Sequence, residues 1–178
     1  MVLWLLLLSA LPACLVSGVP QEVDNLPVLN WAVPKEWLNV KKGCRGHNEL
    51  RAVGDGVADD TLAIQACLDL VSNETQQYSV YFPAGTYRIT STLRLFRALG
   101  VLIVGQGEST RLVWGGSSGG RMALSDGLSR SRFVGLVFDG QNTAAVGFEH
   151  DSHHPGLFET RIRHQNNKVY MCGHFWSL

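Results

Sequence analysis

Four side chains in the C-terminal half of the chain have the chemistry of general acids and bases. They are Asp139, Glu149, Glu159 and His164. A carboxyl or imidazole group held beside a reacting bond can transfer a proton in the transition state. Each of the four is also typical of a structural or exposed position, and the sequence does not show which of them meet. We therefore treat them as candidates, and the catalytic residues stay open at this point.

A second group of residues has the side-chain types that bind metal ions. It is the run His150-Asp151-Ser152-His153-His154, followed directly by Pro155. Adjacent histidines ending at a proline indicate a loop, and a metal site needs a third ligand at a suitable spacing. We expect this run to be solvated surface, and we predict no metal site.

Three further carboxylates, those of Asp55, Asp59 and Asp60, precede a helical pattern. Its apolar members recur at helical spacing and are Ile64, Cys67, Leu68 and Val71. The pattern predicts an amphipathic helix from Asp60 to Val71. Asp at a helix start accepts hydrogen bonds from the unpaired N–H groups of the first turn. Because Gly54-Asp55-Gly56 is typical of a turn, we expect turn and capping roles for the three aspartates, not catalysis.

After Gln77 the pattern changes to that of strands. Short runs of β-forming residues alternate with glycine turns, and no helical segment lies between them: Tyr78–Phe82, Thr86–Leu95, Val101–Val104 and Arg111–Trp114. This arrangement favours an all-β coil over β-α-β units.

A repeat of 25 residues follows in the late part of the chain. It relates Phe133 to Phe158, Val137 to Ile162, and Asn142 to Asn167. Such a period is typical of stacked structural repeats, and asparagine at one place in each turn would suit a ladder of side-chain amides. A β-sandwich with coincidental spacing is the alternative.

Three ordered motifs carry a resemblance to a known family. They are Gly54-Asp55-Gly56-Val57-Ala58-Asp59-Asp60-Thr61-Leu62-Ala63-Ile64-Gln65-Ala66, Val80-Tyr81-Phe82-Pro83-Ala84-Gly85-Thr86-Tyr87-Arg88-Ile89, and Leu102-Ile103-Val104-Gly105-Gln106-Gly107. In this order they resemble the N-terminal portion of pectate-lyase-like proteins. The resemblance implies a right-handed parallel β-helix whose first coil is capped by the amphipathic helix. It also implies structural roles for Gly54, Asp55, Gly56, Asp59, Asp60, Thr61, Gly85, Gly105 and Gly107.

The family includes polysaccharide lyases, polygalacturonase-like hydrolases, glucanases, epimerases and phage tailspikes. The resemblance therefore implies an extracellular polysaccharide-active protein, with a uronan or β-glucan as partner. A non-catalytic glycan-binding or fibre-like β-helix is the alternative. Ca²⁺ is implied only if the parent protein is a lyase. Cys172-Gly173-His174 is similar to the Gly-His-Gly of polygalacturonases, but Phe175 replaces the second glycine.

The order of segments predicts four regions. Residues 1–18 contain the apolar run Leu3–Leu8 and indicate a signal peptide, with a lipoprotein anchored through Cys14 as the alternative. Residues 19–51 form an extended lead-in, 52–167 the cap and first coils, and 168–178 an irregular tail. Complete family members stack many more coils, so we expect a fragment that lacks the catalytic coils and can self-associate through its open C-terminal coil.

The composition excludes some classes of binding partner. The 15 basic and 15 acidic side chains balance, and the basic residues are scattered along the sequence, so we predict no nucleic-acid binding. The apolar run is too short for a stable membrane span, which needs about 20 residues. The expected mature chain has three cysteines, Cys44, Cys67 and Cys172, whose pairing stays open, with Cys67 expected as a small core residue. Asn73 begins a glycosylation sequon.

Overall fold

The computed structural model describes the chain except for residues 1–31, 45–48, 73–77, 153–160, 171–173 and 178. The strands are β1 (Leu38–Asn39), β2 (Asp55–Asp59), β3 (Ser79–Tyr81), β4 (Gly85–Ile89), β5 (Leu93–Phe96), β6 (Leu102–Val104), β7 (Thr110–Trp114), β8 (Arg121–Asp126), β9 (Arg132–Val134), β10 (Val137–Asp139), β11 (Val146–Asp151), β12 (Arg163–Gln165), β13 (Lys168–Tyr170) and β14 (His174–Ser177). A helix, α1 (Thr61–Asp69), follows β2, and a 3-10 turn spans Gly107–Ser109.

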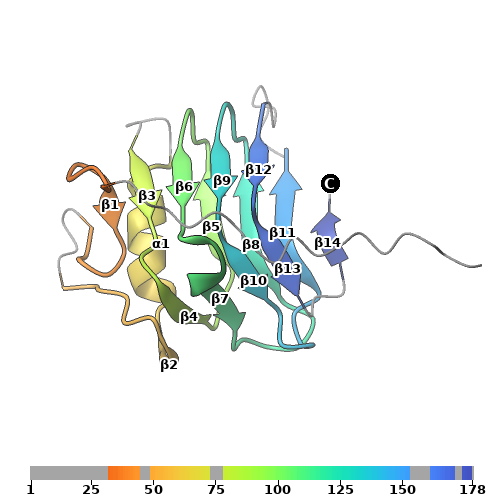
Figure 1. Ribbon diagram of the computed structural model, residues 1–178. Coiled ribbons are helices and arrows are strands. Elements are labelled where there is room, and N and C mark those ends of the chain that lie inside the picture. Colours follow the sequence, from red (N-terminus) through yellow and green to blue (C-terminus); the bar gives the residue numbers. More distant parts are fainter. Residues whose placement is uncertain (1–31, 45–48, 73–77, 153–160, 171–173, 178) are drawn as a thin grey trace, which may run out of the picture.

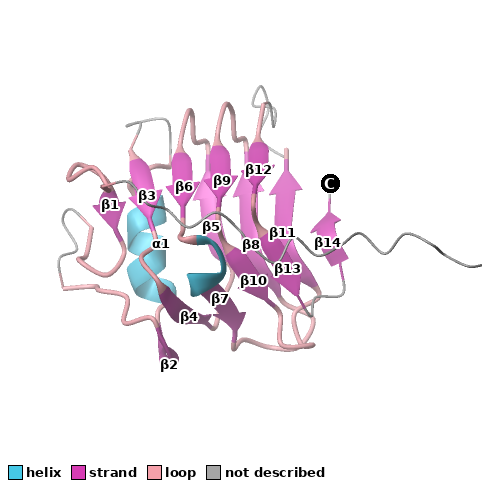
Figure 2. Ribbon diagram, viewed as in Figure 1, coloured by secondary structure: helices cyan, strands magenta, loops and turns pink. Residues whose placement is uncertain are grey.

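These strands form three parallel sheets that the chain visits in turn. The first sheet has the order β1-β3-β6-β9-β12, the second β13-β10-β7-β4-β2, and the third β14-β11-β8-β5. Every strand pairing among the described residues is parallel. Figure 1 shows β3, β6, β9 and β12 of the first sheet standing side by side, and Figure 2 shows how little helix the fold contains. The predicted parallel β-helix is thus confirmed at this level.

Apolar side chains stack in columns inside the coil. In nine of the strands, at least one residue points inward and lies opposite its counterpart in the next coil: Val80, Ile103 and Phe133 in the first sheet, Tyr87, Leu112 and Phe138 in the second, and Leu93, Ala123 and Phe148 in the third. All nine are buried. Alternation of side chains along a strand sends the residues between them outward, and these outward residues are available for a functional site.

The helix lies close to its predicted place, over Thr61–Asp69 instead of Asp60–Val71. It buries Ile64 and Cys67 in the core. Gln65 fixes it to β5, because its side-chain amide accepts a hydrogen bond from the backbone N–H of Arg94 and donates one to the carbonyl of the same residue, at 2.9 Å each.

Among the aspartates before the helix, Asp60 acts differently from the prediction. Asp60 occupies the N-cap position but makes no side-chain hydrogen bond to the helix. Its two carboxylate oxygens accept hydrogen bonds from the backbone N–H groups of Val53 (2.6 Å) and Gly54 (3.0 Å). Asp59 instead accepts from the N–H of Thr61 at 3.1 Å. The buried Asp60 therefore holds the preceding segment, and the exposed Asp59 satisfies the first turn.

Strands also occur where the sequence predicted none. Gly54-Asp55-Gly56 was expected to be a turn, but β2 begins at Asp55, and β1 lies within the expected lead-in. The expected irregular tail contains β13 and β14, each paired with the strand of the preceding coil. Two- to five-residue strands lack enough length for a recognisable alternation, because hydrogen bonding to a neighbouring coil, not local pattern, fixes them.

The expected 25-residue repeat does not describe the pairing. Val137 lies opposite Lys168, not Ile162. Ser79, Leu102, Arg132 and Arg163 share one register position, so successive coils are 23, 30 and 31 residues long. Asn167 connects two coils, since it accepts from the N–H of Leu136 and donates to the carbonyl of Phe133, at 2.9 Å each. The corners between sheets differ in length, and a fixed period misses this variation.

A disulfide joins Cys44 to Cys67. It links the segment after β1 to the buried face of α1, so Cys67 is a core residue as expected and also a bridge partner. The predictions for residues 1–18, Cys14, Asn73, Glu159 and Cys172 lie outside the described residues. Among the described helices, none is long and apolar enough to cross a membrane.

Candidate functional site

The structure describes three of the four candidate residues and does not bring these three together. Asp139 belongs to β10 in the second sheet, Glu149 to β11 in the third and His164 to β12 in the first, while Glu159 lies outside the described residues. Asp139 and Glu149 are each ion-paired with an arginine and His164 points inward, so the three described residues do not face one site.

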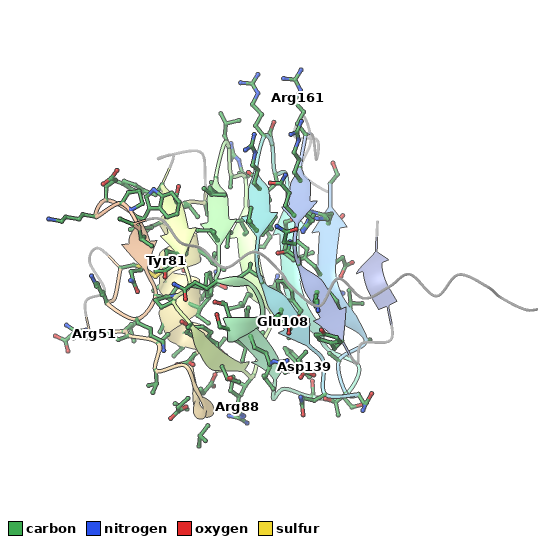
Figure 3. The ribbon with its side chains drawn as sticks, viewed as in Figure 1. Arg51, Tyr81, Arg88, Glu108, Asp139 and Arg161 are labelled. Atoms are coloured by element: carbon green, nitrogen blue, oxygen red, sulfur yellow. A yellow bond between two sulfur atoms is a disulfide. The ribbon has the colours of Figure 1, made fainter. Side chains whose placement is uncertain are left out.

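Asp139 has a structural ion pair. Its carboxylate accepts a hydrogen bond from the guanidinium of Arg111, with 2.9 Å between Oδ2 and Nη1. The Arg111 side chain also lies over the ring of Tyr170, 5.7 Å from its centroid. Asp139 is labelled low in the view of Figure 3. These contacts join three successive strands of the second sheet, so Asp139 is held as part of the coil stack.

His164 points into the coil. Its ring stacks on Phe133, and its Nε2 lies 2.9 Å from Nε2 of His150, whose Nδ1 lies 2.6 Å from Oγ of Ser125. Burial, together with the charge of His150, lowers the pKa of His164 to about 4. The register partner of His164 is the inward-facing Phe133, a relation that the sequence does not show.

The outward face of the third sheet carries the better group. Ala123, Ser125, Phe148 and His150 face inward, so alternation places the intervening residues on the opposite face. We call this group the carboxylate face and define it as Arg94, Phe96, Asp126, Glu149 and Asp151. Phe96, Asp126 and Asp151 occupy one register position in three successive strands, β5, β8 and β11.

The carboxylate face combines carboxylates, a guanidinium group and an aromatic ring, although Asp126 is only 7% exposed. Directly opposite residues on neighbouring strands have Cβ atoms about 4.5–5.5 Å apart, so Asp126 and Asp151 lie next to each other. Glu149 forms an ion pair with Arg121, with 2.7 Å between Oε2 and Nη1. Arg94 is exposed and lies over the ring of Phe96, 6.0 Å from its centroid.

Sequence reasoning missed Asp126 and assigned Asp151 to a metal-like loop. The structure separates that run, because His150 faces the core and Asp151 is the last residue of β11. Among the described residues, no group of three His, Cys, Asp or Glu side chains could hold a metal ion. A count of the strand residues between Phe96, Asp126 and Asp151 would have found the group only with the register already known.

One apolar cavity among the described residues offers no alternative site. An internal cavity of about 30 Å³ is lined by apolar side chains only, among them Leu95, Phe138 and Phe148. It contains no group that could transfer a proton or bind a sugar hydroxyl. The polar groups described above inside the coil are those of His164, His150 and Ser125.

Comparison with known proteins agrees with this architecture. Residues 48–133, just under half of the chain, match the family model described as rhamnogalacturonase A/epimerase, pectate lyase-like. No curated protein sequence matches the chain with significance.

Solved structures share the fold. ORF18 of Geobacillus virus E2 is 25% identical with a TM-score of 0.60, over 77% of this chain and 26% of that one. The A-module of the mannuronan C-5 epimerase AlgE4 of Azotobacter vinelandii is 24% identical with a TM-score of 0.60, over 78% of this chain and 40% of that one. The A-module of AlgE6 from the same organism gives 23% and 0.52, over 75% and 40%. The chain thus spans well under half the length of these structures.

Three parallel sheets visited in turn around an apolar interior define a β-helix protein. Residues 48–133, in the N-terminal portion of the chain, resemble the pectate-lyase-like superfamily.

Proposed function

We propose that this chain is the N-terminal part of an extracellular polysaccharide-active β-helix protein that acts on its glycan at the carboxylate face. The observation that carries the proposal is the register pairing of Asp126 with Asp151 on one outward face, in a chain that matches a pectate-lyase-like family model. The lengths of the matched structures support a longer parent protein.

The carboxylate face would suit proton transfer at a uronic acid. Removal of the proton beside the uronate carboxyl group starts both elimination and inversion at that carbon, and it requires a base and a cation that stabilises the developing negative charge. The half-buried carboxylate of Asp151 would serve as the base, beside that of Asp126, which is only 7% exposed. The exposed guanidinium of Arg94 would pair with the sugar carboxylate, and the ring of Phe96 would pack against the sugar.

The test uses the parent protein, expressed from its complete reading frame. This protein is incubated with pectin, alginate and β-glucan. Ultraviolet absorbance detects unsaturated uronides, a reducing-end assay detects hydrolysis, and proton NMR detects epimerisation. We expect Asp126→Asn and Asp151→Asn to lower turnover by about 100-fold or more. Glu36→Gln is the matched control, because Glu36 is exposed and distant in sequence from the face. Full activity in both aspartate variants would contradict the proposal.

A second function, glycan binding without turnover, is favoured by one observation. Two of the original candidate carboxylates, Asp139 and Glu149, are already ion-paired with arginines. Binding of a glycan with none of the three reaction products would support this alternative.

Several finer features belong to the same proposal. The Cys44–Cys67 disulfide supports export, since such bridges persist in oxidising compartments. Mass spectrometry of the mature N-terminus would distinguish cleavage after Gly18 from a lipid-bearing Cys14.

We propose that the coil is right-handed, as nearly all parallel crossovers are, and that α1 covers the first coil with its buried face. We also propose that the chain alone is inactive and self-associates through its last coil, which analytical ultracentrifugation would detect.

A further inference from the structure

Four exposed arginines gather at the corner where the chain passes from the third sheet to the first. We call them the arginine corner: Arg130, Arg132, Arg161 and Arg163. Arg132 and Arg163 begin β9 and β12 and are register partners. Arg130 and Arg161 stand two residues before them. Figure 3 shows Arg161 pointing away from the body of the molecule at the top of the view.

The fold does not neutralise these charges. Within the described part of the chain, none of the four guanidinium groups makes an ion pair or a side-chain hydrogen bond. Like charges directly opposite each other on neighbouring strands are destabilising. The pairing of Arg132 with Arg163 therefore opposes folding, and the arginines need a reason other than stability.

The backbone gives a second, independent observation. Arg130 and Arg161 both have φ of 54°, in the left-handed region that favours glycine. In the preceding coil the equivalent position is occupied by Gly100, with φ of 69°, because Leu102 pairs with Arg132. Two successive coils thus have arginine where the backbone favours glycine. An unfavourable backbone conformation retained in this way points to a function of the side chain.

We propose that the arginine corner binds a polysaccharide chain that carries carboxylate or sulfate groups, oriented along the axis of the coil. Guanidinium groups bind such oxyanions through paired hydrogen bonds. Neighbouring strands are about 4.7–4.9 Å apart, a step comparable to one sugar ring of an extended chain. The rows Arg130–Arg161 and Arg132–Arg163 would contact the anionic groups of successive sugars.

A polysaccharide fits better than a nucleic acid. The formal net charge of the chain is zero, whereas nucleic-acid binding relies on a general basic excess. The basic residues are scattered along the sequence, but the fold gathers four of them at this corner. The inference is independent of turnover at the carboxylate face, because it concerns different residues and is measured as binding.

The experiment measures binding of the full-length chain to heparin and to polygalacturonate by calorimetry. Dextran is the neutral control, and duplex DNA represents the alternative class of anionic ligand. We expect binding to at least one anionic glycan, weakening as NaCl rises, and none to dextran. The variant Arg132→Gln/Arg163→Gln should bind about tenfold more weakly or worse. Arg51→Gln/Lys42→Gln makes the same charge change at exposed positions elsewhere and should bind as the unmodified chain does.

A second variant separates binding from folding. Arg130→Gly/Arg161→Gly removes two charges but suits the left-handed backbone, so its melting temperature should be equal or higher while its affinity for the anionic glycan falls. Three results would overturn the proposal: no binding to either anionic glycan, unchanged affinity in both arginine variants, or tighter binding to duplex DNA than to either glycan.

Discussion

The ring of His164 lies face to face with that of Phe133, with 4.9 Å between ring centroids and 6° between ring planes. The histidine therefore continues an inward-facing column that is apolar in the coils before it. Its neutral form suits this place, because an imidazolium there would lose hydration and lie beside His150.

The depressed pKa of His164 predicts a loss of stability in acid. The pKa falls from 6.5 to about 4 on folding, so the folded state binds fewer protons. The stabilisation is complete above pH 6.5 and is lost as pH falls towards 4. Because the side chain is partly exposed, we expect a loss of about 2 kcal/mol, less than the full shift would give. Urea unfolding as a function of pH measures it.

His164→Gln is the control for this prediction. Glutamine can still hydrogen-bond to His150 but does not titrate, so the pH dependence between 6.5 and 4 should become flatter. An equally steep dependence in the variant would assign the effect to another group.

Reduction of the Cys44–Cys67 bridge should destabilise the fold. The bridge closes a loop with a sequence separation of 23 residues, and a loop of this size predicts about 3 kcal/mol from chain entropy. The variant Cys44→Ala/Cys67→Ala, compared with the unmodified chain in thermal melts without reductant, measures the loss. Cys172→Ser is the matched control and should leave the melting temperature unchanged; a similar fall in that variant would contradict the assigned pairing.

Asp60→Asn should destabilise the protein by about 1–3 kcal/mol. Each carboxylate oxygen of Asp60 accepts from a different backbone N–H group, and an amide would turn a donor towards one of them. Asp55 is the comparison, because a single oxygen, Oδ1, accepts from both Val57 and Ala58. Asp55→Asn can keep both bonds and should leave the midpoint of denaturation nearly unchanged. Equal losses in chemical denaturation would disprove this explanation.

Arg111→Met should cost about 1–2 kcal/mol, because it leaves the carboxylate of Asp139 buried without its cation. The Asp139 side chain is only 7% exposed. Arg121→Met is the matched change, and it should cost less because its partner, the Glu149 side chain, is 19% exposed. Adding Asp139→Leu to Arg111→Met should recover part of the lost stability, because no buried carboxylate is then left without its cation. If stability is not recovered, the packing of Arg111 on Tyr170 matters more than the ion pair.

The parallel coil and the helix could be predicted because each has a recognisable local pattern in the sequence. Ile64 and Cys67 repeat at helical spacing, and the runs around Val80, Ile103 and Leu112 are short, apolar and bounded by glycine. The site required more than this. Whether Asp126 lies beside Asp151, or His164 on Phe133, depends on the register between coils, and corners of unequal length set that register.

The unequal corners also bear on how such a molecule can change over generations. One register position in three successive coils is occupied by Leu102, Arg132 and Arg163, although 30 and then 31 residues separate them in the sequence. Segments such as Gly115–Gly120, between β7 and β8, can therefore lengthen or shorten while the stacked columns keep their alignment. Within a strand, one inserted residue would turn the following side chains to the opposite face. New loops, and with them new specificities, can thus arise at the corners without redesign of the core.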